Sequence, residues 1–194
     1  EMTAPEQTVL LITQRLTYLE DIDEERESLD PRWHKLIKDL GNVVLVPLSY
    51  TQDISMIFQS YNVAGIILSG GNDVFNGNIV MCGADDGRNL TSQLSLKRDS
   101  FERSLTEEAL RRGVKVFGVC RWLQFICLHF GATIQKVSNH VACTHKVVEH
   151  INSARKERSK MAKALLALFS GSYQLVNSFH NFGIPISAKV FLSV

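Results

Sequence analysis

The chain has 194 residues, of which 45% are hydrophobic and 21% are charged, and its formal net charge is +1 at pH 7. A chain of this length buries a sizeable apolar core, so we expect a single domain over residues 1–194. The small net charge argues against nucleic acid or an anionic membrane as a partner. No apolar run reaches the roughly 18 residues that a membrane-spanning helix needs.

Apolar runs and helical patterns alternate along residues 8–130. In chain order they predict strand Thr8–Ile12, helix Arg32–Leu40, strand Val43–Val46, helix Asp53–Tyr61, strand Gly65–Leu68, helix Arg98–Arg112, strand Val114–Val119 and helix Leu123–Phe130. Asp30 and Pro31 form the N-cap and first turn of the first helix. On the third helix, the 3.6-residue period predicts that Phe101, Leu105 and Leu110 face the core.

This alternation predicts an α/β fold with a doubly wound, mostly parallel sheet and helices on both faces, of the flavodoxin-like type. Such sheets bind their ligands at the carboxyl ends of the strands. Cys120, the Ser69–Asp73 loop and the Thr13–Arg15 loop all follow predicted strands. We therefore expect a functional site where these three segments meet.

A long polar stretch, Asn76–Ser95, separates the third strand from the third helix. It contains the turn-forming residues Gly77, Gly83, Asp85 and Gly87. A loop of this length in a compact domain is usually either functional or disordered. The sequence leaves two alternatives open, a substrate lid and plain disorder.

The four cysteines, at positions 82, 120, 127 and 143, show neither a CxxC pair nor zinc-ligand spacing. The first residues lack the apolar segment of a secretory signal. Together these observations predict a reduced, cytoplasmic setting. His140, His145 and His150 lie close in sequence, but no carboxylate or cysteine joins them at ligand spacing. We therefore expect no metal site and no cofactor.

Cys120 lies in a segment, Val116–Gln124, that has the sequence form of a nucleophile elbow. A strand-like run leads into Gly118-Val119-Cys120, and a helical apolar pattern follows at once. In such an elbow the strand carries the nucleophile to the edge of the sheet and the turn holds it out. The N-terminus of the following helix favours the thiolate over the thiol. The pattern therefore predicts Cys120 as a nucleophile.

Two further segments supply the groups that a thiol nucleophile needs. Val176–His180 is typical of a short strand that ends in a histidine, and an imidazole titrates in the right range to move the thiol proton. The pair Gly70-Gly71 follows a strand, where its backbone N–H groups can face an oxyanion. The N–H of Arg121 is the second expected donor. Each signal alone is also typical of a tight turn or of a packed histidine.

Taken together, four segments resemble the class I glutamine amidotransferase-type domains, in their γ-glutamyl hydrolase branch, the peptidase C26 family. The matching segments are Gly65–Val74, Arg98–Glu102, Gly118–Gln124 and Asn177–His180, and the likeness spans roughly residues 8–190. The resemblance implies a cysteine hydrolase with Cys120 as nucleophile, His180 as its base, and Gly71 and Arg121 as oxyanion donors. It also implies a small γ-glutamyl substrate that contacts Gly70, Asn72, Asp99, Glu102, Gln124 and Ser178.

Further segments narrow the resemblance to the γ-glutamyl-CDP-amidate hydrolases of bacterial capsule phosphoramidate synthesis. They are Ile12–Leu16, Glu27–Trp33, Asn139–Val141 and His145–Val147. Such a substrate implies a place for its pyrophosphate, and the basic stretch at residues 146–163 could bind it. The alternative is that this stretch is a solvated helix face. Likewise, Asp99 and Glu102 could serve only to stabilise the start of a helix, where acids are favourable.

Two positions depart from the family pattern. Trp122 stands where the family has glycine, and so we expect it either to block the pocket or to pack outward. Phe182 stands where many amidotransferases carry the glutamate that orients the histidine. The triad acid therefore either lies beyond Val194 or is absent.

The sequence thus leaves three functions open. The first is a hydrolase that forms a γ-glutamyl thioester on Cys120 and releases glutamate. The second is a catalytically impaired binding or regulatory domain, and the third is a glutaminase subunit that delivers ammonia to a synthase partner. The oligomeric state is not set by the sequence, and a homodimer is left open.

Overall fold

The computed structural model describes residues 7–38, 41–71, 75–76, 79–80, 90–129, 131–147, 174–180 and 182–185. The chain divides into two compact units. The first holds Glu1–Thr133 and Ile186–Val194, and the second holds Ile134–Pro185. The expectation that the whole chain forms one domain stays a prediction.

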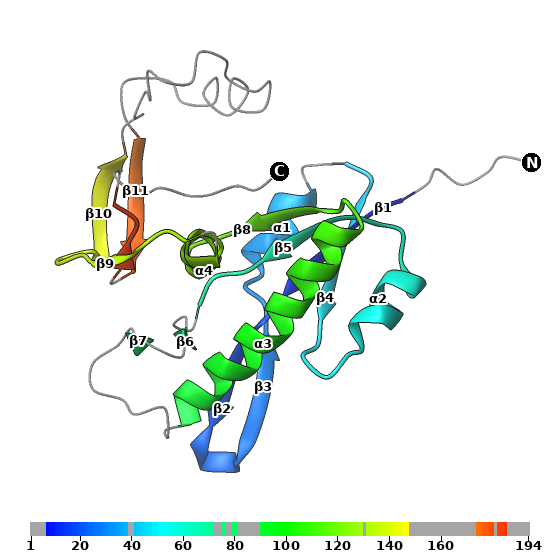
Figure 1. Cartoon of the computed structure of the whole chain (residues 1–194), viewed down its shortest axis with the longest axis horizontal. Coiled ribbons are helices and arrows are strands. Elements are labelled where there is room, and N and C mark those ends of the chain that lie inside the picture. The colour runs from blue at the N-terminus through cyan, green and yellow to red at the C-terminus, as the bar shows by residue number, and fades with distance from the viewer. Residues whose placement is uncertain are drawn as a thin grey trace, which may run out of the picture. The chain divides into compact units, whose positions relative to one another are not determined.

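The first unit is built on a four-stranded parallel sheet in the order β4-β1-β5-β8 (Figure 1). Its strands are β1 (Thr8–Thr13), β4 (Val43–Leu48), β5 (Val63–Leu68) and β8 (Lys115–Gly118). All four predicted strands are therefore present, and their parallel pairing confirms the predicted sheet. Pro47 lies inside β4, one residue beyond the predicted end of this strand, and it is tolerated there because β4 is an edge strand.

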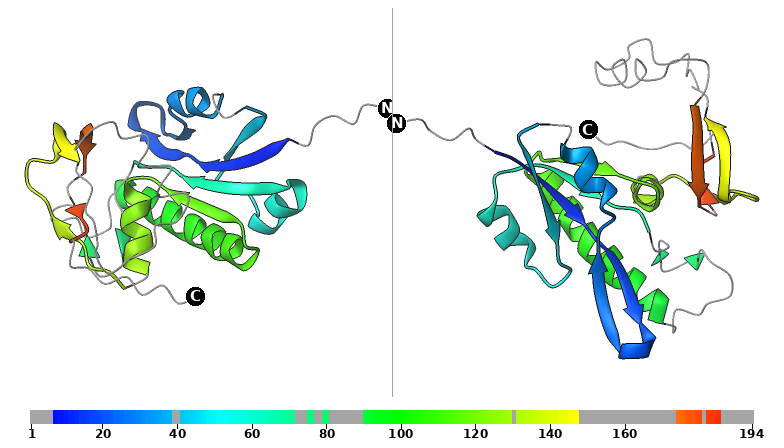
Figure 2. Two further views of the ribbon diagram at one scale, coloured as in Figure 1. Left: turned by 90° about the horizontal axis from the view of Figure 1, so that it is seen from above. Right: turned by 180° about the vertical axis from the view of Figure 1, so that it is seen from behind.

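Helices cover both faces of this sheet, as predicted (Figure 2). They are α1 (Arg32–Lys38), α2 (Ile54–Ser60), α3 (Leu90–Arg111) and α4 (Arg121–His129). Successive strand residues point to opposite faces. Leu11 packs in one cluster with residues of α2, α3 and α4, whereas Ile12 packs in another with Ile37 of α1. Among the helices in the described ranges, none combines the length and the apolar character that crossing a membrane requires.

The long helix α3 differs from its predicted form in two ways. It begins at Leu90 rather than at Arg98, so the end of the long polar stretch is helical. Leu110 is 53% exposed, which corrects the expectation that it faces the core. Ala109 is buried instead, beside Leu105, because residues four apart lie on the same side of a helix.

The rest of the long polar stretch is only partly described. Two short strands, β6 (Phe75–Asn76) and β7 (Ile79–Val80), pair antiparallel. Residues 81–89 lie outside the described residues. The choice between a lid and a disordered loop therefore stays open.

A β-hairpin that the sequence did not predict follows β1. β2 (Arg15–Leu19) pairs antiparallel with β3 (Glu24–Ser28), and a short 3-10 helix, η1 (Glu20–Ile22), joins them. Leu16 is fully buried and packs with Tyr50. Most other residues of the hairpin are exposed, so no alternation of buried apolar and polar residues marks these strands.

The second unit contains short antiparallel strand pairs. β10 (Val141–Val147) pairs with β11 (Gln174–Phe179), and β9 (Gln135–Lys136) pairs with β12 (Phe182–Gly183). β11 confirms the short strand predicted before His180. Residues 148–173 lie outside the described residues, so the role of the basic stretch stays a prediction.

Candidate active site

Three loops of the first unit meet at the carboxyl ends of β1, β5 and β8, which are neighbours in the sheet. A Cβ atom built on Gly70 would lie 3.3 Å from Cβ of Cys120, and one built on Gly71 would lie 3.0 Å from Cδ of Arg15. The three segments therefore stand side by side, at the edge where open α/β sheets bind ligands. Gly71 has a φ of +88°, a conformation that favours glycine.

Cys120 has the backbone of a nucleophile elbow. Its φ is +54°, in the left-handed region that residues other than glycine rarely adopt. Such conformations cluster at functional sites, where the surrounding structure holds them. Cys120 directly precedes α4, and its carbonyl oxygen accepts a hydrogen bond from the N–H of Gln124 at 3.3 Å. The residue is exposed, so the predicted strand–turn–helix context and the access to the thiol are both present.

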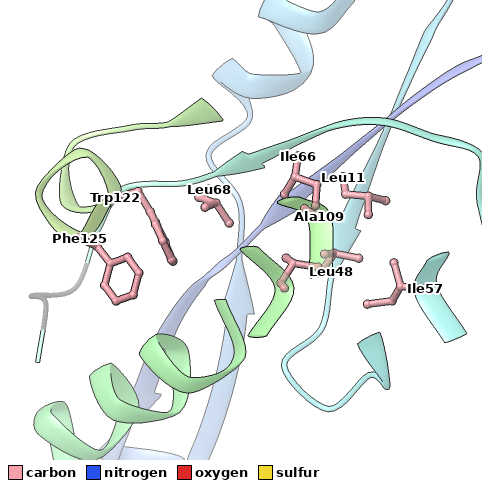
Figure 3. Close-up of a cluster of buried hydrophobic side chains, with 9 residues drawn as sticks. Leu11, Leu48, Ile57, Ile66, Leu68, Ala109, Trp122 and Phe125 are labelled. Atoms are coloured by element: carbon pink, nitrogen blue, oxygen red, sulfur yellow. The ribbon is translucent and has the colours of Figure 1, made fainter. Parts of the chain in front are cut away.

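Trp122 packs into the core of the first unit, which corrects the expectation that it packs outward. The expectation that it blocks the pocket stays a prediction. Trp122 is fully buried, and its ring centroid lies 4.3 Å from that of Phe125 (Figure 3). Leu68, at the end of β5, belongs to the same cluster. The close approach of α4 to β8 also explains Gly118, because a Cβ atom there would lie 2.9 Å from Cβ of Trp122. Trp122 thus supports the elbow from within the core.

The carboxylates of Asp99 and Glu102 are buried within α3 and do not lie at a helix start. Glu102 accepts hydrogen bonds from the Tyr50 hydroxyl at 3.0 Å and from Nη1 of Arg121 at 2.6 Å. Burial raises the pKa of Glu102, and the positive charge of Arg98 opposes that shift. The first alternative for these acids, a contact with substrate, stays a prediction. The contacts of Glu102 with Tyr50 and Arg121, and of Asp99 with Arg121, show that these two acids also link the segments of the site.

Arg121 follows the nucleophile and is anchored through its side chain. Its guanidinium group is 2% exposed and forms ion pairs with Glu102 and Asp99. The backbone N–H predicted to face the oxyanion therefore belongs to a residue that the core holds in place. Gln124, predicted to contact substrate, is half-buried on the first turn of α4.

His180 and Ser178 lie together in the second unit. Ser178 is 2% exposed, and its Oγ lies 3.2 Å from Nδ1 of His180. This ring nitrogen is the one that the carboxylate orients in a Ser-His-Asp triad. Ser178 therefore occupies the position of an orienting group, and Nε2 is the ring nitrogen left to meet a thiol.

The environment of His180 disfavours its charged form. Its ring centroid lies 5.1 Å from that of His140, which lies 4.5 Å from that of His145. Burial lowers the pKa of His180, and the positive charge that His140 and His145 can carry lowers it further. A histidine with a lowered pKa is neutral, and therefore able to accept a proton, over more of the physiological pH range.

Some predicted features are not tested. Asn72 and His150 lie outside the described residues. Cys120 and His180 belong to different units, so their pairing stays a prediction. Within the described ranges, no three His, Cys, Asp or Glu side chains are grouped so as to hold a metal ion.

Arg98 is a member of this site that the sequence did not single out. It is fully buried on α3, and its Nη2 donates to Oε1 of Glu102 at 2.8 Å. The available signal was a pair of opposite charges four residues apart, which lie on one face of a helix. The same face carries Leu105, which is also fully buried.

Several known proteins are related in sequence to this chain. The sequence pattern of the peptidase C26 family matches residues 11–193. A gamma-glutamyl-CDP-amidate hydrolase of Campylobacter jejuni is 33% identical over 177 residues, which cover 89% of this chain and 70% of that protein. A glutamine amidotransferase-like protein of Lactococcus lactis is 27% identical and covers 75% of this chain, which spans 61% of that relative.

Solved structures share the fold at low sequence identity. A protein from Thermoplasma acidophilum, described as part of a GMP synthase, superposes with a TM-score of 0.54 at 18% identity, over 95% of this chain and 70% of that one. A glutamine amidotransferase from Thermotoga maritima gives a TM-score of 0.51 at 12% identity, over 93% and 63% of the two chains. These structures support the predicted fold class.

Proposed function

The chain belongs to the peptidase C26 family, and from this premise we propose that it is a hydrolase that cleaves a γ-glutamyl C–N bond with Cys120 as nucleophile. The observation that carries the proposal is the exposed cysteine at φ +54° between β8 and α4, beside the Gly70-Gly71 turn. That geometry is costly for a cysteine and presents its sulfur at the ligand-binding edge of the sheet.

The reaction has two stages. The Cys120 thiol loses its proton to Nε2 of His180, and the sulfur attacks the γ-carbonyl carbon of the substrate. The C–N bond then breaks as the departing nitrogen takes that proton, which leaves a γ-glutamyl thioester. Water, deprotonated by the same imidazole, attacks the thioester; glutamate leaves and the thiol is restored.

Two backbone N–H groups stabilise the oxyanion in both stages. The Gly71 N–H comes from the turn after β5, and the Arg121 N–H comes from the start of α4. Fixed donors of this kind act where negative charge develops and need no reorganisation during the reaction. Ser178 orients the imidazole through Nδ1, a role that the apolar side chain of Phe182 in β12 cannot fill.

The position of Arg15 is an argument for an anionic substrate. Its exposed side chain lies against Gly71, at the rim of the proposed site, and it forms no ion pair with another described residue. A guanidinium group at that place matches the phosphate of a nucleotide-linked leaving group, because it can donate two parallel hydrogen bonds. The name of the Campylobacter jejuni relative, a gamma-glutamyl-CDP-amidate hydrolase, points to the same substrate class.

The Arg15→Gln variant is expected to raise KM for a phosphate-linked γ-glutamyl substrate roughly 10- to 100-fold, the value of one charge-assisted contact. The kcat value should change little, because Arg15 does not touch the reacting carbonyl. Arg26→Gln is the matched control, since Arg26 lies on the same hairpin but pairs with Glu24. Steady-state kinetics with the phosphate-linked substrate measure these values. Equal KM values in Arg15→Gln and wild type would contradict a role of Arg15 in binding the phosphate.

The function itself is tested by glutamate release from three substrates: a nucleotide-linked γ-glutamyl phosphoramidate, γ-glutamyl-p-nitroanilide and glutamine. We expect release from the first two, with the higher kcat/KM for the phosphate-linked compound. Release from glutamine alone, or only with a second protein, would favour a glutaminase subunit. No release from any substrate would favour an impaired binding domain. A cytoplasmic location, a role in capsule synthesis and a homodimer stay predictions.

A further inference from the structure

The side chain of Arg98 holds the turn that follows β5 through hydrogen bonds to the carbonyl groups of that turn. The side chain is fully buried. Its Nη2 donates to the carbonyl oxygen of Ser69 at 3.1 Å, and its Nη1 donates to those of Gly70 at 3.4 Å and Gly71 at 3.1 Å. One planar guanidinium group thus contacts three successive peptide carbonyls.

These contacts determine where the neighbouring N–H groups point. In a trans peptide unit the N–H is directed opposite to the C=O. The carbonyl of Ser69 shares a peptide unit with the N–H of Gly70, and the carbonyl of Gly70 shares one with the N–H of Gly71. Because Arg98 draws both carbonyls toward α3, both N–H groups are turned away from α3, which makes them available to a ligand.

Glu102 connects this turn to the elbow. Its Oε1 accepts from Nη2 of Arg98 at 2.8 Å, and its Oε2 accepts from Nη1 of Arg121 at 2.6 Å and from Nε1 of Trp122. Asp99 forms an ion pair with Arg121 as well. Two arginines and two carboxylates, all buried, therefore link the two segments that carry the proposed oxyanion donors.

We infer that Arg98 is a positioning residue that sets the Gly71 N–H toward the oxyanion, and that Glu102 keeps this donor in register with the Arg121 N–H. The inference rests on the proposed function, because it assigns a purpose to the oxyanion donors. Lysine cannot replace Arg98 fully, since a single ammonium group cannot span three carbonyls and a carboxylate with the fixed geometry of a guanidinium.

The test uses Arg98→Lys and Arg98→Gln in the full chain. Loss of one oxyanion donor costs roughly 10²- to 10³-fold in kcat, and we expect Arg98→Gln to approach that loss with KM within a few-fold of wild type. Arg98→Lys should retain part of the kcat that Arg98→Gln loses. Arg111→Gln is the matched control, because Arg111 lies on the same helix but is exposed and pairs with Glu108.

A second readout separates a positioning role from a merely structural one. The Cys120 thiol adds to the aldehyde analogue of γ-glutamyl substrates and gives a hemithioacetal. A C–S bond forms, the π bond of the aldehyde C=O group breaks, and the thiol proton passes to the aldehyde oxygen, which takes the place of the oxyanion. Arg98→Gln should weaken binding of this aldehyde by about the same factor as kcat. The rate at which iodoacetamide alkylates Cys120 should stay unchanged, because that reaction uses no oxyanion donor.

The outcomes distinguish the inference from the proposed function. A wild type that neither turns over nor binds the aldehyde would overturn the function. An active wild type, with Arg98→Gln equal to it in kcat and aldehyde affinity, would overturn only the role of Arg98. If both variants fail to fold, the crystal structure of the wild-type aldehyde adduct decides. The Gly71 N–H must then contact the former aldehyde oxygen, and any other direction of that N–H would contradict the inference.

Discussion

The Cys120→Ser variant is expected to fold like the wild type and to lose at least ~10³-fold in glutamate release. Serine has nearly the same shape, and the position is exposed, so the φ of +54° imposes the same strain on both residues. The loss follows because a hydroxyl keeps its proton at neutral pH, whereas a thiolate is readily formed and is the stronger nucleophile.

The matched control for this variant is Cys127→Ser. Cys127 lies on α4, half-buried, and burial raises the pKa of its thiol, so it should contribute nothing to catalysis. Initial rates and melting temperatures of the three proteins give the comparison. Turnover at the wild-type rate in Cys120→Ser would show that the nucleophile lies elsewhere.

The His180→Asn variant is expected to lose roughly 10³-fold in kcat, with a much smaller change in KM. Asparagine can still form a hydrogen bond with Ser178 through its amide group, but it cannot take the thiol proton or protonate the departing nitrogen. His34→Asn, an exposed histidine on α1 of the other unit, should be unaffected. Wild-type kcat in His180→Asn would exclude a catalytic role for the second unit through this residue.

The pKa of His180 provides a separate test of its pairing with the thiol. In Cys120→Ser, burial and the neighbours His140 and His145 should hold the pKa of His180 below its ordinary value of about 6.5. In the wild type, a thiolate beside the ring would favour imidazolium and raise that pKa. NMR titration of the ring protons should therefore give a higher midpoint in the wild type. Identical midpoints would show that the two groups do not meet.

The two central strands of the sheet, β1 and β5, were predictable from the sequence because they are covered on both faces. Val9–Ile12 and Ile66–Leu68 read as unbroken apolar runs for that reason. The β2–β3 hairpin was not predictable, since most of its residues are exposed and only Leu16 is fully buried. The early start of α3 was hidden because its first turns carry the polar residues that elsewhere mark a loop.

The candidate site was predictable in part. A strand, a glycine and a helix around Cys120 require a sharp turn, and the structure has it. The burial of Trp122 was not predictable, because a large residue beside a nucleophile suggests a blocked pocket or an outward side chain, and only its packing against Phe125 and Leu68 reveals the burial. Arg98 was not singled out because an arginine in a helix, even one four residues from a glutamate, is usually solvated, and the three carbonyls that it contacts come from the distant segment Ser69-Gly70-Gly71.

The most direct test of the account is the covalent state of Cys120 during turnover. Wild-type protein at saturating γ-glutamyl substrate is quenched in acid, digested and examined by mass spectrometry. We expect the peptide that contains Cys120 to carry one glutamyl group, released by hydroxylamine as a thioester would be. A glutamyl group on any other residue, or an unmodified Cys120 peptide in a sample that releases the nitrogen leaving group in a pre-steady-state burst ahead of glutamate, would contradict the proposed mechanism.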